Sequence, residues 1–99
     1  MISISEARDL VFQELKKEPE FDLVIQDSET IEKEWGWVFF YQSRKFIESG
    51  DFRDMVVGNA PYIVNKESGD LHITGTASDI FHYINEYEKS LIHNKKGQS

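Results

Sequence analysis

An aromatic run in the middle of the chain restricts the possible folds more than any other feature. Residues 35–43 read Trp-Gly-Trp-Val-Phe-Phe-Tyr-Gln-Ser. Successive side chains of a strand point to opposite faces, so Trp37 and Phe39 would lie on one face and Val38 and Phe40 on the other. A strand that is apolar on both faces needs cover on both faces. The run therefore predicts the central strand of a sheet.

The residues before this run predict a helix and a further strand. Ser3 and Glu6 match a capping box, and the apolar residues that follow recur at helical spacing, which predicts a helix over 4–17. Apolar residues that alternate over 21–26 predict a strand. The acidic stretch 27–34 is expected to turn the chain into the central strand.

The residues after the run predict a short helix and a hairpin. The connection 44–60 is long for a structureless loop, so a short helix is expected over 51–57, with its first residue as the cap. Strands are predicted over 62–66 and 71–74. Between them, Gly69 can take the positive φ that a hairpin turn or its bulge requires.

A final helix is predicted, with Thr76 or Ser78 as its cap. Its apolar residues fall on one stripe at helical spacing. They are Ile80, Ile84, Tyr87 and Leu91. The polar tail 93–99 is expected to fray.

Together these elements predict one α+β domain over residues 1–99. Two helices with one apolar stripe each can cover only one face of an antiparallel sheet. We therefore expect two layers, with a sheet of about four strands and both the N- and C-terminal helices packed on one face. The other face would be open to a partner or covered by the connection 44–61. One core is expected to hold Trp37, Phe39, Ile63, Ile73, Ile84 and Leu91.

Charge is concentrated in one segment. The chain has 18 acidic and 11 basic residues and a net charge of −7, and residues 18–34 hold seven acids against Lys33 alone. We expect no nucleic-acid partner, because phosphate binding needs a basic patch. No apolar run approaches the ~20 residues of a membrane span, and the first residues lack the features of a signal peptide. We therefore expect no membrane contact and a cytoplasmic location.

The residue pattern indicates neither catalysis nor metal binding. No cysteine is present, which excludes disulfides, thiolate metal sites and a cysteine nucleophile. His82 and Glu86 stand four apart on the final helix, but they offer two ligands where zinc needs three or four. The serines lack the sequence context of a nucleophile elbow. We predict no enzymatic activity, no metal and no cofactor.

Four motifs carry a resemblance to a known family. They occupy residues 37–43, 48–51, 58–64 and 66–69. In this order and spacing they resemble the bacterial immunity protein 35 family, also called the YrhB-like domain. The resemblance extends over nearly the whole chain, and the acidic segment 18–34 is where it is loosest. The motif residues that we interpret as structural are Trp37, Tyr41, Gly50, Asp51, Gly58, Asn59, Pro61 and Gly69.

This resemblance implies a function that composition alone does not. Proteins of this kind are small cytoplasmic α+β proteins, found at polymorphic toxin loci, that are expected to bind and neutralise a cognate toxin domain. The resemblance brings no catalytic residues. An alternative is a general protein-binding or chaperone-like module that is not linked to a toxin. The sequence is also compatible with a homodimer.

The candidate partner-binding residues are five neighbours in the acidic segment. They are Asp27, Glu29, Glu32, Glu34 and Trp35. A concentrated acidic edge raises the association rate with a basic protein face, and an aromatic anchor beside it would add affinity. The connection 44–61 is a second candidate surface.

Overall fold

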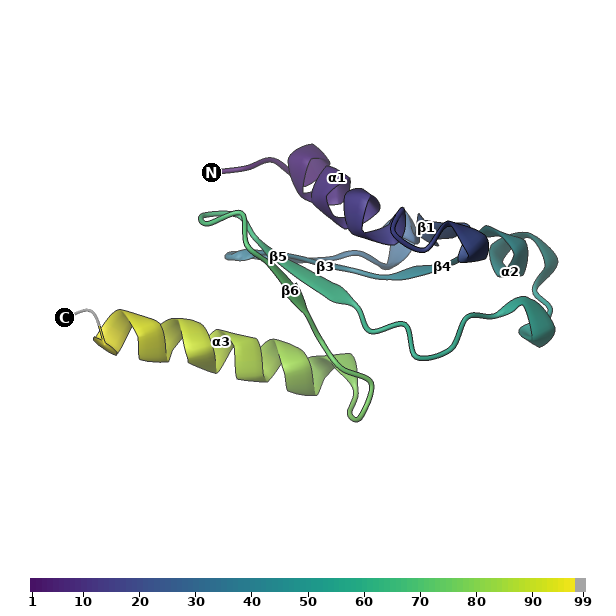
Figure 1. The fold of residues 1–99 in the computed structure, drawn as a ribbon. Helices are drawn as coiled ribbons and strands as arrows, with labels where there is room; N and C mark the ends of the chain where they lie inside the picture. The colour runs from purple at the N-terminus through teal and green to yellow at the C-terminus, as the bar shows by residue number, and fades with distance from the viewer. Residues whose placement is uncertain (98–99) are drawn as a thin grey trace.

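The computed structural model describes the backbone of residues 1–97 and the side chains of residues 1–92. Over this part the chain forms α-helices, strands and short 3₁₀-helices (Figure 1). The helices are α1 (Ile4–Leu15), α2 (Arg44–Ser49) and α3 (Ile80–Gly97), with 3₁₀-helices η1 (Pro19–Phe21), η2 (Asp27–Glu29) and η3 (Phe52–Asp54). The strands are β1 (Leu23–Ile25), β2 (Ile31–Lys33), β3 (Gly36–Phe39), β4 (Tyr41–Ser43), β5 (Tyr62–Asn65) and β6 (Leu71–Ile73).

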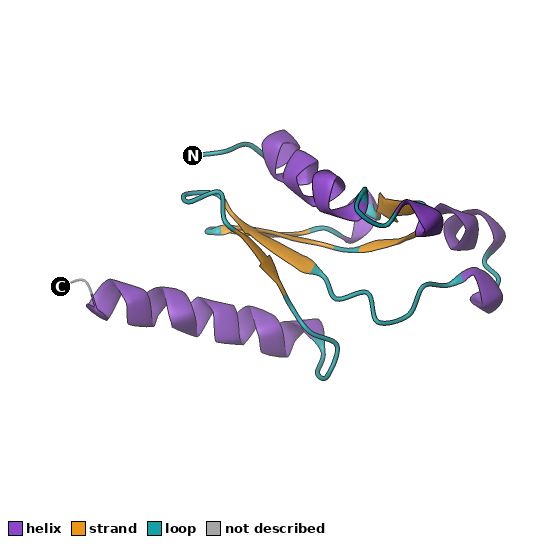
Figure 2. Ribbon diagram, in the orientation of Figure 1, coloured by secondary structure: helices purple, strands orange, loops and turns teal. Residues whose placement is uncertain are grey.

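The strands form a four-stranded sheet and a two-stranded sheet, both antiparallel. The larger has the order β2-β3-β5-β6, and the smaller pairs β1 with β4 (Figure 2). The predicted strand 35–43 therefore divides at Phe40, and its first half, β3, has the predicted central place. On the β5 side, the β3 ladder ends where Phe39 faces Tyr62. Pro61, which comes directly before Tyr62 in the chain, has no N–H with which to extend the ladder.

The α+β class is confirmed, but the prediction that both helices lie on one face is wrong. Figure 1 shows α1 on one side of the four-stranded sheet and α3 on the other. The α1 side buries Val11 against Trp37 and Phe39, whereas the α3 side buries Ile84 against Val38. Because β3 is apolar on both faces, each face needs cover, and each helix supplies it to one of them. The molecule therefore has three layers.

The prediction of one core is wrong for the same reason. Trp37 and Phe39 belong to the α1-side cluster, and Ile63 and Ile84 belong to the α3-side cluster. Ile73 is 57% exposed because it lies on the outer strand β6. Leu91 is half-buried and belongs to neither cluster.

Several boundaries differ from the sequence predictions. Residues 27–34 do not simply turn the chain, because they form η2 and then the outer strand β2. The predicted strand 21–26 is shorter, since η1 ends at Phe21 and Asp22 is left-handed with φ 46°. Helix α2 was missed, although the Ser43 side chain caps it.

The predicted caps have different outcomes. The capping box at the start of α1 is confirmed, and so is Asp51 as a helix cap, but the helix predicted over 51–57 is only the 3₁₀ turn η3 and ends at Asp54. Neither Thr76 nor Ser78 caps α3: the Asp79 carboxylate accepts a hydrogen bond from the His82 backbone N–H (3.1 Å). The helix therefore starts one residue after an acid, which suits its dipole.

The hairpin is confirmed, with β5 paired to β6 and Gly69 at φ +75°. The Asn65 side-chain oxygen accepts hydrogen bonds from the backbone N–H groups of Glu67 and Ser68 (2.9 and 3.1 Å). In the tail 93–99, the backbone is helical as far as Gly97, while residues 98–99 and the tail's side chains lie outside the described residues.

Candidate protein-binding site

The structure places three of the predicted acids on one edge of the sheet. Glu29 is the last residue of η2, Glu32 lies in the outer strand β2, and Glu34 lies in the turn to β3; all three are exposed. We call these three residues the acidic edge. Charged side chains on an outer strand discourage other chains from pairing with its free backbone groups. The acidic edge can therefore serve solubility, partner attraction or both.

Asp27 and Trp35 have other contacts. The Asp27 carboxylate pairs with the Arg8 guanidinium of α1 at 2.6 and 2.9 Å, which ties η2 to that helix. Trp35 packs its ring 4.8 Å from that of Tyr87, and its Nε1 donates a hydrogen bond to the Glu88 carboxylate (3.0 Å). Both partners of Trp35 belong to α3. The five predicted residues are thus three exposed acids and two residues that hold helices to the rest of the fold.

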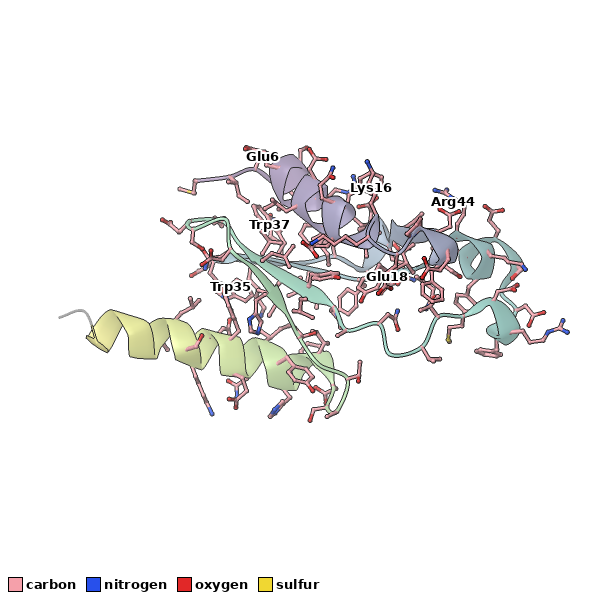
Figure 3. All side chains as sticks on the ribbon, in the orientation of Figure 1. Glu6, Lys16, Glu18, Trp35, Trp37 and Arg44 are labelled. Atoms are coloured by element: carbon pink, nitrogen blue, oxygen red, sulfur yellow. The ribbon has the colours of Figure 1, made fainter. Side chains whose placement is uncertain are left out.

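Trp35 and Trp37 lie on opposite sides of the sheet although they are only two residues apart. Figure 3 shows Trp37 on the α1 side and Trp35 on the α3 side. Regular alternation would place residues i and i+2 on the same face. Gly36 stands between them at φ +155°, and an added Cβ would meet the Val64 carbonyl oxygen at 1.9 Å. Only glycine lets the backbones of residues 36 and 64 approach this closely. The conformation of Gly36 accompanies the shift from the α3 side at Trp35 to the α1 side at Trp37.

The first residues of the motif 58–64 are bound to β4 through side-chain hydrogen bonds. The Asn59 amide donates to the Tyr41 carbonyl (2.7 Å), and the Tyr41 hydroxyl donates back to the Ala60 carbonyl (2.9 Å). Beside it, the Pro61 carbonyl accepts hydrogen bonds from the backbone N–H and the hydroxyl of Thr74. These contacts fix the entry to β5.

Gln42 extends this arrangement and had not been predicted as an important residue. Its side chain is buried, and its amide exchanges two hydrogen bonds with the backbone of Val56 (3.1 and 2.7 Å). The Ser43 hydroxyl donates to the Asp54 carbonyl (2.7 Å). The Gln42 side chain thus pairs with the connection as a strand backbone would. The only sequence signal was a polar amide at the end of an otherwise apolar run.

The connection that these hydrogen bonds hold in place, residues 56–59, forms one wall of a groove of about 390 Å³. The end of α1 and η1 form the opposite wall, and the aromatic rings of Tyr41 and Tyr62, 5.3 Å apart, lie side by side within it. We call this site the tyrosine groove. Its lining includes Glu14, Glu18, Phe21, Tyr41, Val57 and Tyr62.

The tyrosine groove has neutral phenols and a negative rim. Burial, followed by the neighbouring Tyr62, raises the pKa of Tyr41 to about 12. Burial and the Glu14 charge raise the pKa of Tyr62 as well. Lys17 also lines the groove and pairs with Glu14 (2.9 Å), whereas Glu18 has no ion pair among the residues described. The groove is therefore best suited to a partner group that is both apolar and positively charged.

Sequence reasoning could not find this groove. Its lining comes from the end of α1, from β4 and from the start of β5, which are far apart in the chain. The groove lies beside β5 and β6, at one edge of the four-stranded sheet. The acidic edge includes part of β2, the outer strand at the opposite edge of that sheet.

Within the described residues, no group of three or more histidine, aspartate or glutamate side chains is arranged to hold a metal ion. No helix found there has the length and apolar character needed to cross a membrane.

The fold and the site define a small antiparallel α+β protein with a groove on one side and an acidic edge on the other. The chain belongs to the immunity protein 35 family, because the sequence model of the family described as Immunity protein 35 matches residues 5–90. That match runs from α1 into α3 and includes every strand named above.

One curated relative is the uncharacterized protein YrhB of Escherichia coli (strain K12). It is 43% identical over 53 residues, which make up 54% of this chain and 56% of YrhB. The aligned segment thus spans about half the length of that relative. No solved structure matches this chain.

Proposed function

We propose that this chain is an immunity protein that binds a cognate toxin domain stoichiometrically in the cytoplasm and neutralises it without catalysis. The observation that carries the proposal is the family match over residues 5–90. The structure supports it with two surfaces suited to a basic protein partner, the acidic edge and the tyrosine groove.

Growth rescue tests this function. A candidate toxin domain, taken from a gene that neighbours this chain's gene, is expressed alone and together with the chain. We expect arrest in the first case, growth in the second, and a complex with one copy of each protein on purification. Arrest that persists although both proteins are present and folded would contradict the proposal.

The acidic edge acts, in this proposal, on the rate of association. Exposed charges contribute little affinity, but their field steers a basic partner toward the surface, and salt screens that field. Changing Glu29, Glu32 and Glu34 to Lys brings the net charge from −7 to about −1. The variant should bind more slowly and with a flatter salt dependence, while its folding stays nearly unchanged.

A matched variant separates local charge from total charge. Glu48, Glu67 and Glu86 are exposed glutamates outside the acidic segment. Changing these three to Lys gives the same net charge. Association rates of both triple variants with the toxin domain are measured at low and high salt. Slower binding confined to the acidic-edge variant supports the proposal, and equal rates in both variants would show that the acidic edge has no steering role of its own.

The second candidate function is a chaperone-like module that binds exposed apolar segments. Its support is the exposure of Phe52 (80%), Val57 (83%) and Phe81 (70%). The two functions differ in selectivity. A chaperone-like module would suppress the aggregation of unrelated unfolded proteins and leave toxin-arrested cells arrested, whereas an immunity protein would do the reverse.

A further inference from the structure

We infer that the tyrosine groove is the contact that holds the toxin, and that it receives an arginine side chain flanked by apolar residues. The inference rests on the proposed function and adds the chemistry of the partner segment. The arginine stem would lie along the half-buried ring of Tyr62, which packs on the buried Tyr41, with its guanidinium beside Glu18.

The size and lining of the groove fit a side chain of this kind. A volume of about 390 Å³ lies at the lower end of the range for ligand sites, which suits one long side chain and parts of its neighbours. The half-buried Tyr62 ring lies 5.3 Å from that of the buried Tyr41 and is tilted by 31° to it, so the apolar stem of a long cationic side chain can lie along Tyr62 while its charged head reaches the rim.

Charge complementarity indicates that the group bound in the groove is positively charged. Glu14 and Glu18 both line the groove, and Lys17 is paired with Glu14. Figure 3 shows Glu18 between the end of α1 and the connection that leads into β5. A guanidinium can form two parallel hydrogen bonds with a carboxylate, and Glu18 has no competing ion pair among the described residues. An anionic group would instead meet the negative rim.

Exposed apolar residues around the groove indicate what should flank the arginine. Val57 is 83% exposed, Ile73 57% and Phe21 43%, and all three line the groove. Apolar side chains that are exposed together at a groove commonly mark a protein contact. A partner segment with apolar residues on both sides of its arginine would remove this surface from water.

The groove is also firmly built on one side. Gln42, Asn59 and the Tyr41 hydroxyl hold its wall through hydrogen bonds of 2.7 to 3.1 Å. Preorganised contacts lose less conformational entropy on binding. A rigid aromatic pocket with a charged rim has the character of an interface hot spot.

A peptide experiment tests the chemistry without the toxin. The isotope-labelled chain is titrated with the capped peptide Gly-Leu-Arg-Leu-Gly and, as a control, with the same peptide carrying neutral citrulline in place of arginine. We expect NMR shift changes centred on the backbone amides of Glu18, Val57 and Asn59, with affinity in the millimolar range. The affinity for the citrulline peptide should be at least about fivefold weaker than for the arginine peptide.

Two variants of neighbouring acids complete this test. Glu18 and Glu20 are both exposed and only two residues apart, but only Glu18 lines the groove. E18Q should abolish the preference for arginine over citrulline, and E20Q should keep it. The inference is overturned if the arginine peptide causes no change at these amides up to about 10 mM, if both peptides bind equally, or if both variants behave alike.

The toxin complex separates failure of this inference from failure of the proposed function. With the purified toxin domain, E18K should dissociate at least about tenfold faster than the wild type, and E20K should dissociate at the wild-type rate. If the toxin binds and E18K dissociates like the wild type, the groove is not the contact, although the proposed function stands. If the wild type binds no toxin, the proposed function fails, and the peptide experiment still reports on the groove.

Discussion

Truncating Phe39 should remove a large part of the folding free energy. Its side chain is fully buried (0% exposed) in the α1-side cluster, between α1 and the central strand β3. Phe→Ala changes in a core cost about 3–5 kcal/mol, because transfer energy is lost and a cavity remains. The whole folding free energy of a chain of this length is about 5–15 kcal/mol. F39A should therefore lose between about a fifth and all of it.

Urea and thermal unfolding, followed by circular dichroism, measure this loss. In a domain of this size, each kcal/mol of lost stability lowers Tm by about 4 °C or more. A loss of about 3 kcal/mol should therefore lower Tm by at least about 12 °C. The control is F81A, which changes the same residue type on α3 where it is 70% exposed, and which should cost less than about 0.5 kcal/mol. The packing of β3 against α1 would be refuted by an F39A protein within about 1 kcal/mol of the wild type, or by equal losses in the two variants.

Three further predictions concern the backbone and pH. G36A should cost about 3 kcal/mol or more, measured by urea unfolding, because its Cβ would meet the Val64 carbonyl oxygen at 1.9 Å; near-wild-type stability would refute this close approach. G69V should cost about 1–3 kcal/mol in the same assay, because a β-branched residue is strained at φ +75°; an unchanged midpoint would contradict that backbone assignment. The pKa of Tyr41 is raised from 10.0 to about 12 in the folded chain, so the unfolded chain loses its proton first and stability should fall as pH rises from 10 to 12. Y41F should show a smaller fall in alkaline unfolding, and an identical pH profile would count against the buried phenol.

Local signals in the sequence predicted the elements with the clearest chemistry. The Ser3 and Glu6 pair forms the capping box at 3.2 Å in both directions, because the two side chains need only their own first turn. Asp51 caps η3 and Gly69 has positive φ for the same local reason. The predicted alternation of Trp37 and Phe39 against Val38 and Phe40 is confirmed by the two clusters.

The arrangement of layers could not be predicted in this way. An apolar stripe states that a helix has a buried side, but it does not state which face of the sheet covers it. The strand β2 was missed because Glu32 and Lys33 give it the charged composition of a loop, although such residues are common on outer strands. Helix α2 is only six residues long, too short for a periodic signal.

The candidate site shows a similar division. Local charge density predicted the three exposed glutamates of the acidic edge, but long-range contacts determine what their neighbours do. Asp27 pairs with Arg8, which is 19 residues away, and Trp35 bonds to Glu88, which is 53 residues away. The tyrosine groove likewise depends on contacts between separate segments. Exposure and charge can be inferred from a sequence window, whereas a surface composed of several elements requires the fold.

A titration of toxin activity tests the central claim of stoichiometric neutralisation most directly. A fixed amount of the purified toxin domain, well above the dissociation constant of the complex, receives increasing amounts of this chain, and the remaining toxin activity is measured at early and late times. We predict a linear loss that is complete at one equivalent and does not change with time. A loss of activity that continues with time at a small fraction of one equivalent would show turnover and contradict the claim, as would full toxin activity in the presence of excess chain.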